Sequence, residues 1–407
     1  MNTEKRRVLL VNNSVYLPGE GGYKRTMYMY DMMKRMGYPV TLVTGDFNHY
    51  KKSVRNVEEF KKNYPDYSDI VFLHMPKYKK NISLKRYYSE KYWSVQFNKW
   101  FKKHAKDFDV VFFSDIDYNL PVDKICVKHG IKKIVDIRDL RPEAFKVVVK
   151  NNFLYNVLFF PMKLKANKAY ACADEFVSVS REYLDRGLSA NTKSKNPAVV
   201  YLGSTLEKFF QGVEKYSDEI VKPEGEFWVS YAGTLGESYD LFTLIDAAKK
   251  LESAYDGKIK FKILGQGPDE EKLRKHVEKI DAKNVEFIGF LPYEKMAAFL
   301  CKSDITVNAI KKKASQSIIN KVADYFASGA PMLNSCTCQE QRDMVDDYQV
   351  GMNYEAENPD SLAEVIRKLY DDPDLRKQYG ENAKKLALEK FDRRTSYLEI
   401  LKRIDEV

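Results

Sequence analysis

Lys321 and Asp324 lie three residues apart in the segment SQSIINKVADYFASGAP, and their side-chain types suit a nucleotide. An ammonium in the first turns of a helix can neutralise a diphosphate that also accepts hydrogen bonds from backbone N–H groups. A carboxylate about one turn further on can accept hydrogen bonds from the two hydroxyls of a ribose. The same residues also fit an amphipathic helix with a solvated ion pair and a glycine-containing stop.

Three glycine-containing loops each join an expected strand to an expected helix. They are LPGEGGYKRT at 17–26, YAGTLGESYD at 231–240 and LGQGPDEEKL at 264–273. Glycine allows backbone N–H groups to approach an anion at the start of a helix, although a plain turn explains the first loop equally well. The third loop contains a good helix start, so structure alone explains much of it. The first loop is not a G-x-G-x-x-G sequence, which argues against nicotinamide chemistry.

The elements that must position these residues are short apolar runs alternating with helical segments. In the first half the expected strands are 6–13, 40–45, 69–75, 109–115, 132–139 and 175–180. In the second half they are 227–233, 258–265, 285–290, 305–310 and 331–335. This alternation predicts parallel sheets covered by helices on both faces. We therefore expect an α/β protein with two Rossmann-like doubly wound domains facing a central cleft.

The length of 407 residues also favours two domains. The polar, glutamate-rich stretch 210–226 is the natural boundary. We expect an N-terminal acceptor-binding domain at 1–210 and a C-terminal nucleotide-sugar-binding domain at 211–385. Residues 386–407 are expected to form a C-terminal helix that crosses back to the N-terminal domain.

Charge is distributed unevenly along the chain. Residues 1–205 hold 37 Lys and Arg against 21 Asp and Glu, a balance of +16, and the remaining residues have a balance of −6. A basic half joined to a mildly acidic half indicates that one half faces a polyanion, either a membrane surface or nucleic acid.

Two stretches carry the basic surface, 74–106 and 145–168. The first has ten Lys or Arg, one acid and eight aromatic residues, and the second mixes apolar residues with lysines and has no acid. Tyr, Trp and Lys together suit the headgroup zone of an anionic membrane, with the lysines Lys79, Lys80, Lys102 and Lys103 as contacts. Single-stranded nucleic acid is the alternative, but no nucleic-acid module accompanies these stretches. The simplest interpretation of both stretches is that they form partly buried helices whose lysines are solvated.

The apolar segments and the cysteines favour neither export nor a membrane-spanning helix. The segment MNTEKRRVLLVNNSVYL lacks a long apolar region and a cleavage site, so we read it as a first strand. The apolar stretch 153–162 is too short to cross a bilayer. Five cysteines without framework spacing fit a reducing cytosol. The Cys336–Cys338 pair has no nearby histidine, so no metal site is expected.

The chain resembles the retaining glycosyltransferase family 4, which has the glycosyltransferase B fold, over nearly its whole length. The motifs that carry the resemblance are GEGGYKR (19–25), DIRDLRPE (136–143), VVYLGSTLEKF (199–209), YAGTLGE (231–237), KILGQGPDEEKL (262–273), VEFIGFLPYEKMAAFL (285–300) and KVADYFASGAP (321–331). Within the family it looks closest to the branch that assembles bacterial surface polysaccharides. The order and spacing of these motifs, and no single one of them, make the resemblance specific.

The resemblance implies a donor site in the C-terminal domain. The donor-binding residues that it implies are Gly21, Gly22, Gly233, Thr234, Gly289, Phe290, Leu291, Gln316, Ser317, Lys321 and Asp324. Of these, Lys321 would meet the diphosphate and Asp324 the ribose, while Gly233 and Thr234 would approach the phosphates. Gly289, Phe290 and Leu291 would border the base, and Gly21 and Gly22 would face the donor phosphate and the acceptor. Asp139 would lie near the transferred sugar, and Asp139 and Lys321 are the catalytic candidates.

The chain departs from the family pattern at three places. Gln316 and Asp324 stand where relatives usually keep two glutamates, and Leu202-Gly203 replaces the usual Asn-Gly of the interdomain join. The basic residues that many relatives carry after the first glycine of the second domain are absent from 234–238. Phosphate neutralisation would therefore depend more heavily on Lys321 and the helix N-terminus.

The implied function is transfer of a hexosyl or N-acetylhexosaminyl group, with retention, from a nucleoside diphosphate donor that is expected to be UDP-linked. The acceptor would be lipid-linked or a polysaccharide, at the inner face of the cytoplasmic membrane, and no metal or other cofactor would be required. Two alternatives remain open. One is a non-catalytic sugar-nucleotide-binding subunit of a transferase complex, and the other is a sugar-nucleotide epimerase on the same fold.

Overall fold

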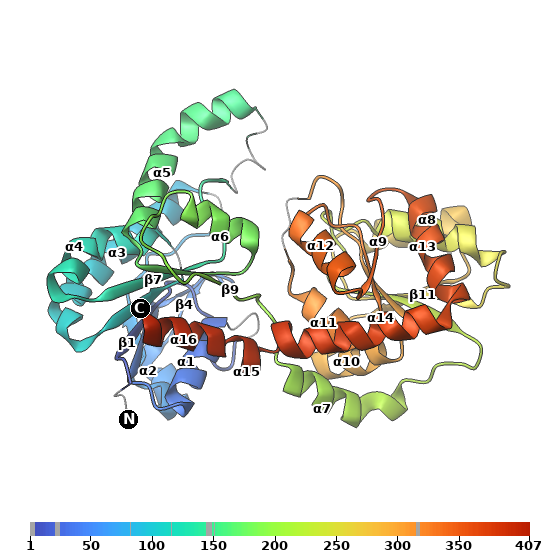
Figure 1. Ribbon diagram of the computed structural model, residues 1–407, viewed down its shortest axis with the longest axis horizontal. Coiled ribbons are helices and arrows are strands. Elements are labelled where there is room, and N and C mark those ends of the chain that lie inside the picture. The colour runs from blue at the N-terminus through green and yellow to red at the C-terminus, as the bar shows by residue number, and fades with distance from the viewer. Residues whose placement is uncertain are drawn as a thin grey trace. The chain divides into compact units, whose positions relative to one another are not determined.

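The structure is a computed structural model that describes residues 5–20, 25–81, 83–114, 116–143, 149, 151–314 and 318–407. The chain forms two compact units (Figure 1). The first comprises Met1–Val200 and Tyr397–Val407, and the second comprises Tyr201–Ser396.

The first unit is built on a seven-stranded parallel sheet of order β5-β2-β1-β6-β7-β8-β9. The strands are β1 (Val8–Val11), β2 (Val40–Gly45), β5 (Val71–Leu73), β6 (Val110–Phe113), β7 (Lys132–Ile137), β8 (Glu175–Ser178) and β9 (Ala198–Val199), and β3 (Phe47–Asn48) pairs antiparallel with β4 (Ser53–Val54). All six predicted strands of this half are present. The two-residue strands β3, β4 and β9 were not predicted, because such short segments have no periodicity to detect.

Helices cover both faces of this sheet. They are α1 (Arg25–Arg35), α2 (Val57–Asn63), α3 (Leu84–His104), α4 (Asn119–His129), α5 (Asn152–Cys172), α6 (Arg181–Leu188) and α16 (Leu398–Glu406), with short 3-10 turns at Pro65–Tyr67, Ala105–Asp107 and Ile116–Tyr118. Alternate residues of β1 enter different cores: Leu9 and Val11 pack with α3 and α4, whereas Val8 and Leu10 pack with α1 and α16. This two-sided burial explains why the strands read as continuous apolar runs.

The second unit repeats the design with a six-stranded parallel sheet of order β12-β11-β10-β13-β14-β15. Its strands are β10 (Phe227–Ala232), β11 (Ile259–Leu264), β12 (Val285–Gly289), β13 (Ile305–Asn308), β14 (Met332–Asn334) and β15 (Gly351–Asn353). Its helices are α7 (Leu206–Tyr216), α8 (Leu241–Glu252), α9 (Glu270–Ile280), α10 (Tyr293–Cys301), α11 (Lys321–Ala327), α12 (Gln339–Asp347), α13 (Pro359–Asp371), α14 (Pro373–Leu386) and α15 (Arg393–Ser396). A short 3-10 helix occurs at Ser217–Glu219, and a π-helical segment, Ala387–Phe391, continues α14. The prediction of two doubly wound α/β domains is confirmed.

The division between the units differs in detail from the expected boundary after residue 210. The units divide at Val200, because the apolar face of α7, including Leu206 and Phe209, packs into a core of the second unit. At the other end of the chain, 386–396 belongs to the second unit. Residues Tyr397–Val407 belong to the first, where α16 buries Ile400 and Ile404.

Candidate functional site

The glycine loops of the second unit meet at the carboxyl ends of β10, β11 and β12. Gly233 N–H donates to the carbonyl of Leu264 at 2.9 Å, and Gly265 N–H donates to the carbonyl of Gly289 at 2.7 Å. Gly265 has a φ of 129°, and a Cβ there would overlap the carbonyl oxygen of Gly233. Only glycine allows this approach. The loops therefore form one continuous backbone surface at the edge of the sheet where α/β proteins bind ligands.

Lys321 lies against this surface. It is the first residue of α11, and its Nζ donates to the hydroxyl of Tyr231 at 3.0 Å. The ammonium also lies 4.3 Å from the ring centroid of Tyr231 and 3.9 Å from that of Tyr239. A Cβ on Gly233 would collide with this ammonium, so the glycine leaves the room that Lys321 fills. Lys321 and Gly233, two of the predicted donor residues, are thus neighbours.

The environment of Lys321 is unusual for a lysine. Burial lowers its pKa to about 7. Within the part of the chain that the structure describes, no carboxylate forms an ion pair with it. Two aromatic faces stabilise a cation by their quadrupoles, but they supply no negative charge. An anion that reaches Lys321 would therefore favour the charged form of a group that its described surroundings leave without a counter-charge.

Asp324 has a different set of partners. Its Oδ1 accepts from the hydroxyl of Tyr293 at 2.8 Å, and that hydroxyl is also 2.8 Å from the Oγ of Ser204. Burial raises the pKa of Asp324 to about 6, although these hydrogen bonds and Arg393 act in the opposite direction. No ion pair joins Asp324 to Lys321 in the described structure, so the solvated ion pair suggested by the sequence alone is not formed.

The other predicted donor residues fall into two groups. In the first group, the carbonyl of Gly289 accepts the hydrogen bond from Gly265. Phe290 is exposed, Leu291 is half-buried, and Thr234 is exposed beside Gly233. Gly21, Gly22, Gln316 and Ser317 lie outside the described residues. Sequence reasoning missed the partners Ser204, Tyr231, Tyr239 and Tyr293. The two tyrosines at 231 and 239 stand within the quoted loop YAGTLGESYD, so a search for aromatic residues beside the glycines would have found them.

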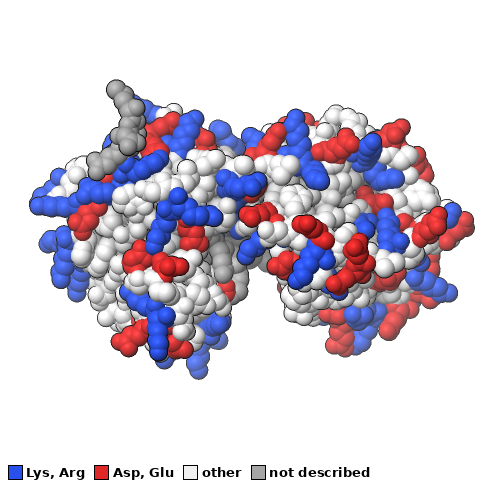
Figure 2. All heavy atoms as spheres, turned by 90° about the horizontal axis from the view of Figure 1, so that it is seen from below, with Lys and Arg blue, Asp and Glu red and all other residues white. Residues whose placement is uncertain are grey.

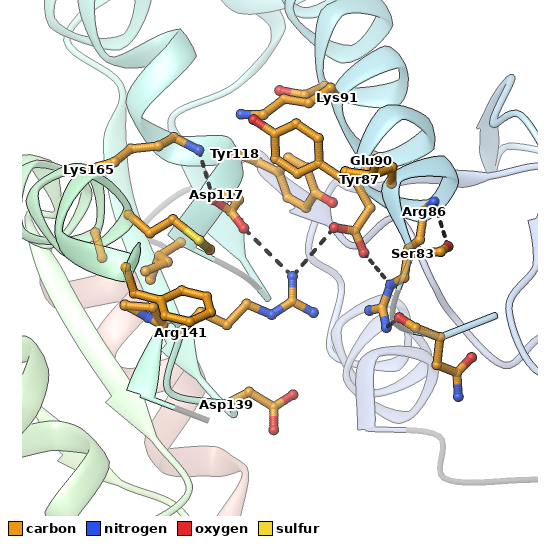
Figure 3. A pocket seen from close by; sticks show the side chains of 18 of the residues that line it. Ser83, Arg86, Tyr87, Glu90, Lys91, Asp117, Tyr118, Asp139, Arg141 and Lys165 are labelled. Atoms are coloured by element: carbon orange, nitrogen blue, oxygen red, sulfur yellow. Dashed lines mark hydrogen bonds and ion pairs between the residues drawn. The ribbon is translucent and has the colours of Figure 1, made fainter. Parts of the chain in front are cut away.

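Asp139 lies far along the chain from these residues, in a pocket of the first unit with a volume of about 750 Å³ (Figure 3). It follows β7, and Asp117, which also lines the pocket, follows β6. The carboxyl ends of these adjacent parallel strands thus place both acids at one edge of the sheet. Asp139 is exposed and has no hydrogen-bond or ion-pair partner among the described residues, so its carboxylate is available to a ligand.

A network of charged groups lines the rest of the pocket (Figure 3). Arg141 lies 3.6 Å from Glu90 and 3.7 Å from Asp117, and Lys165 lies 2.8 Å from the other oxygen of Asp117. Burial alone would raise the pKa of Asp117, but Lys165, Arg141 and Lys91 hold it below its ordinary value. This acid is therefore ionised and serves to orient the cations around it.

The four predicted membrane lysines are all exposed. Lys79 and Lys80 precede α3, whereas Lys102 and Lys103 are in its last turn, so a helix of 21 residues, about 30 Å long, separates the two pairs. They do not form one cluster.

In the view of Figure 2, Asp and Glu gather on the second unit, in keeping with the −6 balance of residues 206–407. No helix among the described residues is long and apolar enough to cross a membrane.

Two Rossmann-like units of this kind define the glycosyltransferase B fold. The chain superposes on the crystal structure of Anabaena Alr3699/HepE in complex with UDP with a TM-score of 0.70 and 13% identity, over 98% of this chain and 100% of that one. Residues 212–386 match the family described as glycosyl transferases group 1. This match lies within the second unit.

Sequence relatives point the same way. An uncharacterized glycosyltransferase of Methanocaldococcus jannaschii, MJ1069, is 25% identical over 392 residues, which cover 90% of this chain and 96% of the relative. The putative colanic acid biosynthesis glycosyl transferase WcaI of Escherichia coli is 22% identical over 161 residues, 38% of this chain and 39% of that protein. Fold, family match and relatives together support a glycosyltransferase enzyme.

Proposed function

We propose that this protein transfers a hexosyl or N-acetylhexosaminyl group, with retention, from a UDP-sugar to a lipid-linked or polysaccharide acceptor. The observation that carries the proposal is the Lys321 ammonium, which lies against the Gly233 loop between two tyrosine rings with no described carboxylate to pair with it. Such a group suits a diphosphate. The UDP bound to HepE supports the uridine nucleotide, and the name of WcaI supports a role in surface-polysaccharide synthesis.

The chemistry requires stabilisation of the leaving group. As the bond between the sugar C1 and the diphosphate oxygen breaks, negative charge grows on the diphosphate, and Lys321 stabilises that charge. The acceptor hydroxyl forms the new bond to C1 from the same face, and its proton passes to a diphosphate oxygen. This route retains the anomeric configuration and needs neither a protein nucleophile nor a metal. Asp324 holds the ribose, and Asp139 lies on the acceptor side.

Replacing Lys321 and Asp324 separately tests this assignment. Lys321→Ala should lower kcat more than donor affinity, by about a hundredfold, because an electrostatic contact of this kind contributes about 3 kcal/mol in the transition state. Asp324→Ala should mainly raise KM for the donor, since the ribose does not change during the reaction. Asp324→Glu, which keeps the carboxylate, should retain binding. Normal steady-state kinetics with both alanine variants would contradict the assignment.

The same assay separates the two alternative functions. A non-catalytic partner subunit would bind UDP and show no turnover with any acceptor. An epimerase would convert the UDP-sugar in the absence of an acceptor. Thermal shifts across a panel of nucleotides and nucleotide sugars identify the donor first, because a ligand stabilises only the protein that binds it.

The proposal includes peripheral binding at the inner face of the cytoplasmic membrane. The N-terminal half of α5 projects from the first unit (Figure 1). Helix α5 exposes seven large apolar side chains, all but the last in this half: Phe153, Leu154, Val157, Leu158, Phe160, Met162 and Leu164. Exposed apolar side chains beside basic ones suit a lipid headgroup region.

A further inference from the structure

The pocket of the first unit combines apolar walls with a charged end (Figure 3). Phe159 and Met162 of α5 form one wall, and Leu84 and Tyr87 of α3 contribute to another. Leu84 is 87% exposed, although apolar side chains of this size are usually buried. Met162 lines the pocket and also belongs to the exposed apolar series on α5, so apolar side chains of this helix lie both in the pocket and outside it.

The charged end holds more cations than acids. Arg86, Lys91, Arg141 and Lys165 line it together with the acids Glu90, Asp117 and Asp139. Asp117 pairs with both Lys165 and Arg141, and Glu90 pairs with both Arg86 and Arg141, so each of these two carboxylates is shared between two cations.

Lys91 of α3 and Lys165 of α5 both line this end of the pocket (Figure 3). Burial and the neighbouring Lys165 ammonium lower the pKa of Lys91, although Asp117 and Glu90 act in the opposite direction. Two like charges repel when they are brought together, and an anion between them removes the repulsion. The geometry therefore suits a multiply charged anionic group at the end of an apolar channel.

We propose that this pocket binds an amphiphile whose phosphate or diphosphate is held by Lys91, Lys165 and Arg141 and whose hydrocarbon chain lies along α5. This inference rests on the proposed function and makes it more specific, because the amphiphile is the lipid-linked acceptor. Asp139, at the same edge of the sheet, then faces the part of the acceptor next to the phosphate. A polysaccharide without a lipid would leave the apolar surface of α5 uncovered.

Farnesyl diphosphate is the probe for this site, below its critical micelle concentration and measured by isothermal titration calorimetry. We expect saturable binding of farnesyl diphosphate, with inorganic pyrophosphate and farnesol each binding at least tenfold more weakly. Geranyl diphosphate, with its shorter chain, should bind with intermediate affinity. Pyrophosphate binding as tight as that of farnesyl diphosphate would identify a site for free phosphates and overturn the proposal, as would no binding of farnesyl diphosphate.

Variants locate the binding site. The double variant Lys91→Ala with Lys165→Ala should weaken farnesyl diphosphate binding at least tenfold. The matched control is Lys99→Ala with Lys128→Ala, which removes two exposed lysines from α3 and α4 away from the pocket lining. Equal effects of the two double variants would overturn the proposal, because binding would then follow net charge alone.

A UDP titration of the same proteins reports on the second unit. Unchanged urea unfolding of the pocket variant shows that its first unit is folded, and unchanged UDP affinity shows that its second unit is intact. Binding of UDP without farnesyl diphosphate would refute the lipid site and leave the donor site standing. Binding of farnesyl diphosphate without UDP would instead refute the proposed transferase donor. Sedimentation tests whether a second copy of the chain occupies the apolar surface instead. A dimer that dissociates when farnesyl diphosphate is added would assign the surface to that second copy.

Discussion

Lys321 shows at the residue scale how a neighbourhood changes the chemistry of a side chain. Because burial lowers its pKa to about 7, half of the unliganded protein carries a neutral amine at that pH. A bound diphosphate favours the charged form and raises the pKa again. UDP binding above pH 7 is therefore coupled to uptake of a proton.

UDP affinity should consequently fall as the pH rises from 7 to 9, by up to about tenfold per pH unit, because the charged form becomes scarce. The Lys321→Ala variant should bind UDP, which carries the charge of the leaving diphosphate, more weakly than the wild type and with a flat profile. Lys321→Arg should also have a flat profile, since a guanidinium stays charged throughout this range. Calorimetric titration at several pH values measures this. A wild-type profile as flat as that of Lys321→Arg would show that Lys321 is fully charged in the free protein.

Asp139 supports a second prediction at this scale. Its exposed carboxylate has no hydrogen-bond or ion-pair partner among the described residues, so it contributes little to folding. Asp139→Asn should therefore keep the melting temperature and the UDP affinity of the wild type while lowering turnover, by about a hundredfold if the carboxylate acts in proton transfer. Unchanged turnover with a lipid-linked acceptor would remove Asp139 from the acceptor site.

At the scale of elements, helix α3 separates the two basic pairs that the sequence treated as one surface. Lys79 and Lys80 lie at the end of α3 that carries the exposed Leu84 and Tyr87. Lys102 and Lys103 lie at the opposite end. Electrostatic attraction to an anionic surface falls off within about 10 Å, so one flat membrane cannot attract both pairs equally when the apolar side chains insert.

Replacing Lys79 and Lys80 with Glu should therefore release the protein from anionic vesicles more completely than replacing Lys102 and Lys103 with Glu. Each lysine near the surface contributes about 1 kcal/mol, less at high salt. Vesicle co-sedimentation measures the bound fraction. Equal loss from both pairs would mean that the whole length of α3 faces the membrane, and equal binding to neutral vesicles would exclude electrostatic attraction.

At the scale of the whole molecule, the chain leaves the first unit at Val200 and returns to it at Tyr397. The returning helix α16 is integral to that unit, since Tyr397, Ile400 and Ile404 are buried in its core. The hydroxyl of Tyr397 also accepts from the buried Arg25, which pairs with Asp136 at 2.9 Å. The end of the chain thus completes the core on one face of the first sheet.

The double variant Ile400→Ala with Ile404→Ala should lower the free energy of unfolding of the first unit by about 6 kcal/mol, because two large buried side chains are removed without replacement. Lys402→Ala, an exposed site on the same helix, should have little effect. Urea unfolding monitored by fluorescence measures both. UDP should still bind the second unit of the double variant, and a loss no larger than that of Lys402→Ala would show that α16 is dispensable.

The sequence alone determined the architecture, because each strand buried on both faces is a recognisable apolar run. The eleven predicted strands all occur, and the glycine loops at 231–240 and 264–273 lie between a strand and a helix as expected. The short strands β9 and β15 escaped prediction, since their pairing with neighbours, and not their own composition, makes them strands. Local patterns cannot report such contacts.

Only the tertiary structure decided what surrounds the candidate site residues. Lys321 meets Tyr231, which is 90 residues away along the chain, and Asp324 meets Tyr293 instead of Lys321. The pocket around Asp139 likewise needs α3, α5 and the ends of β6 and β7 together. Burial, pKa and charge compensation arise from groups that are distant in sequence and adjacent in space, so they follow from packing and not from the order of residues.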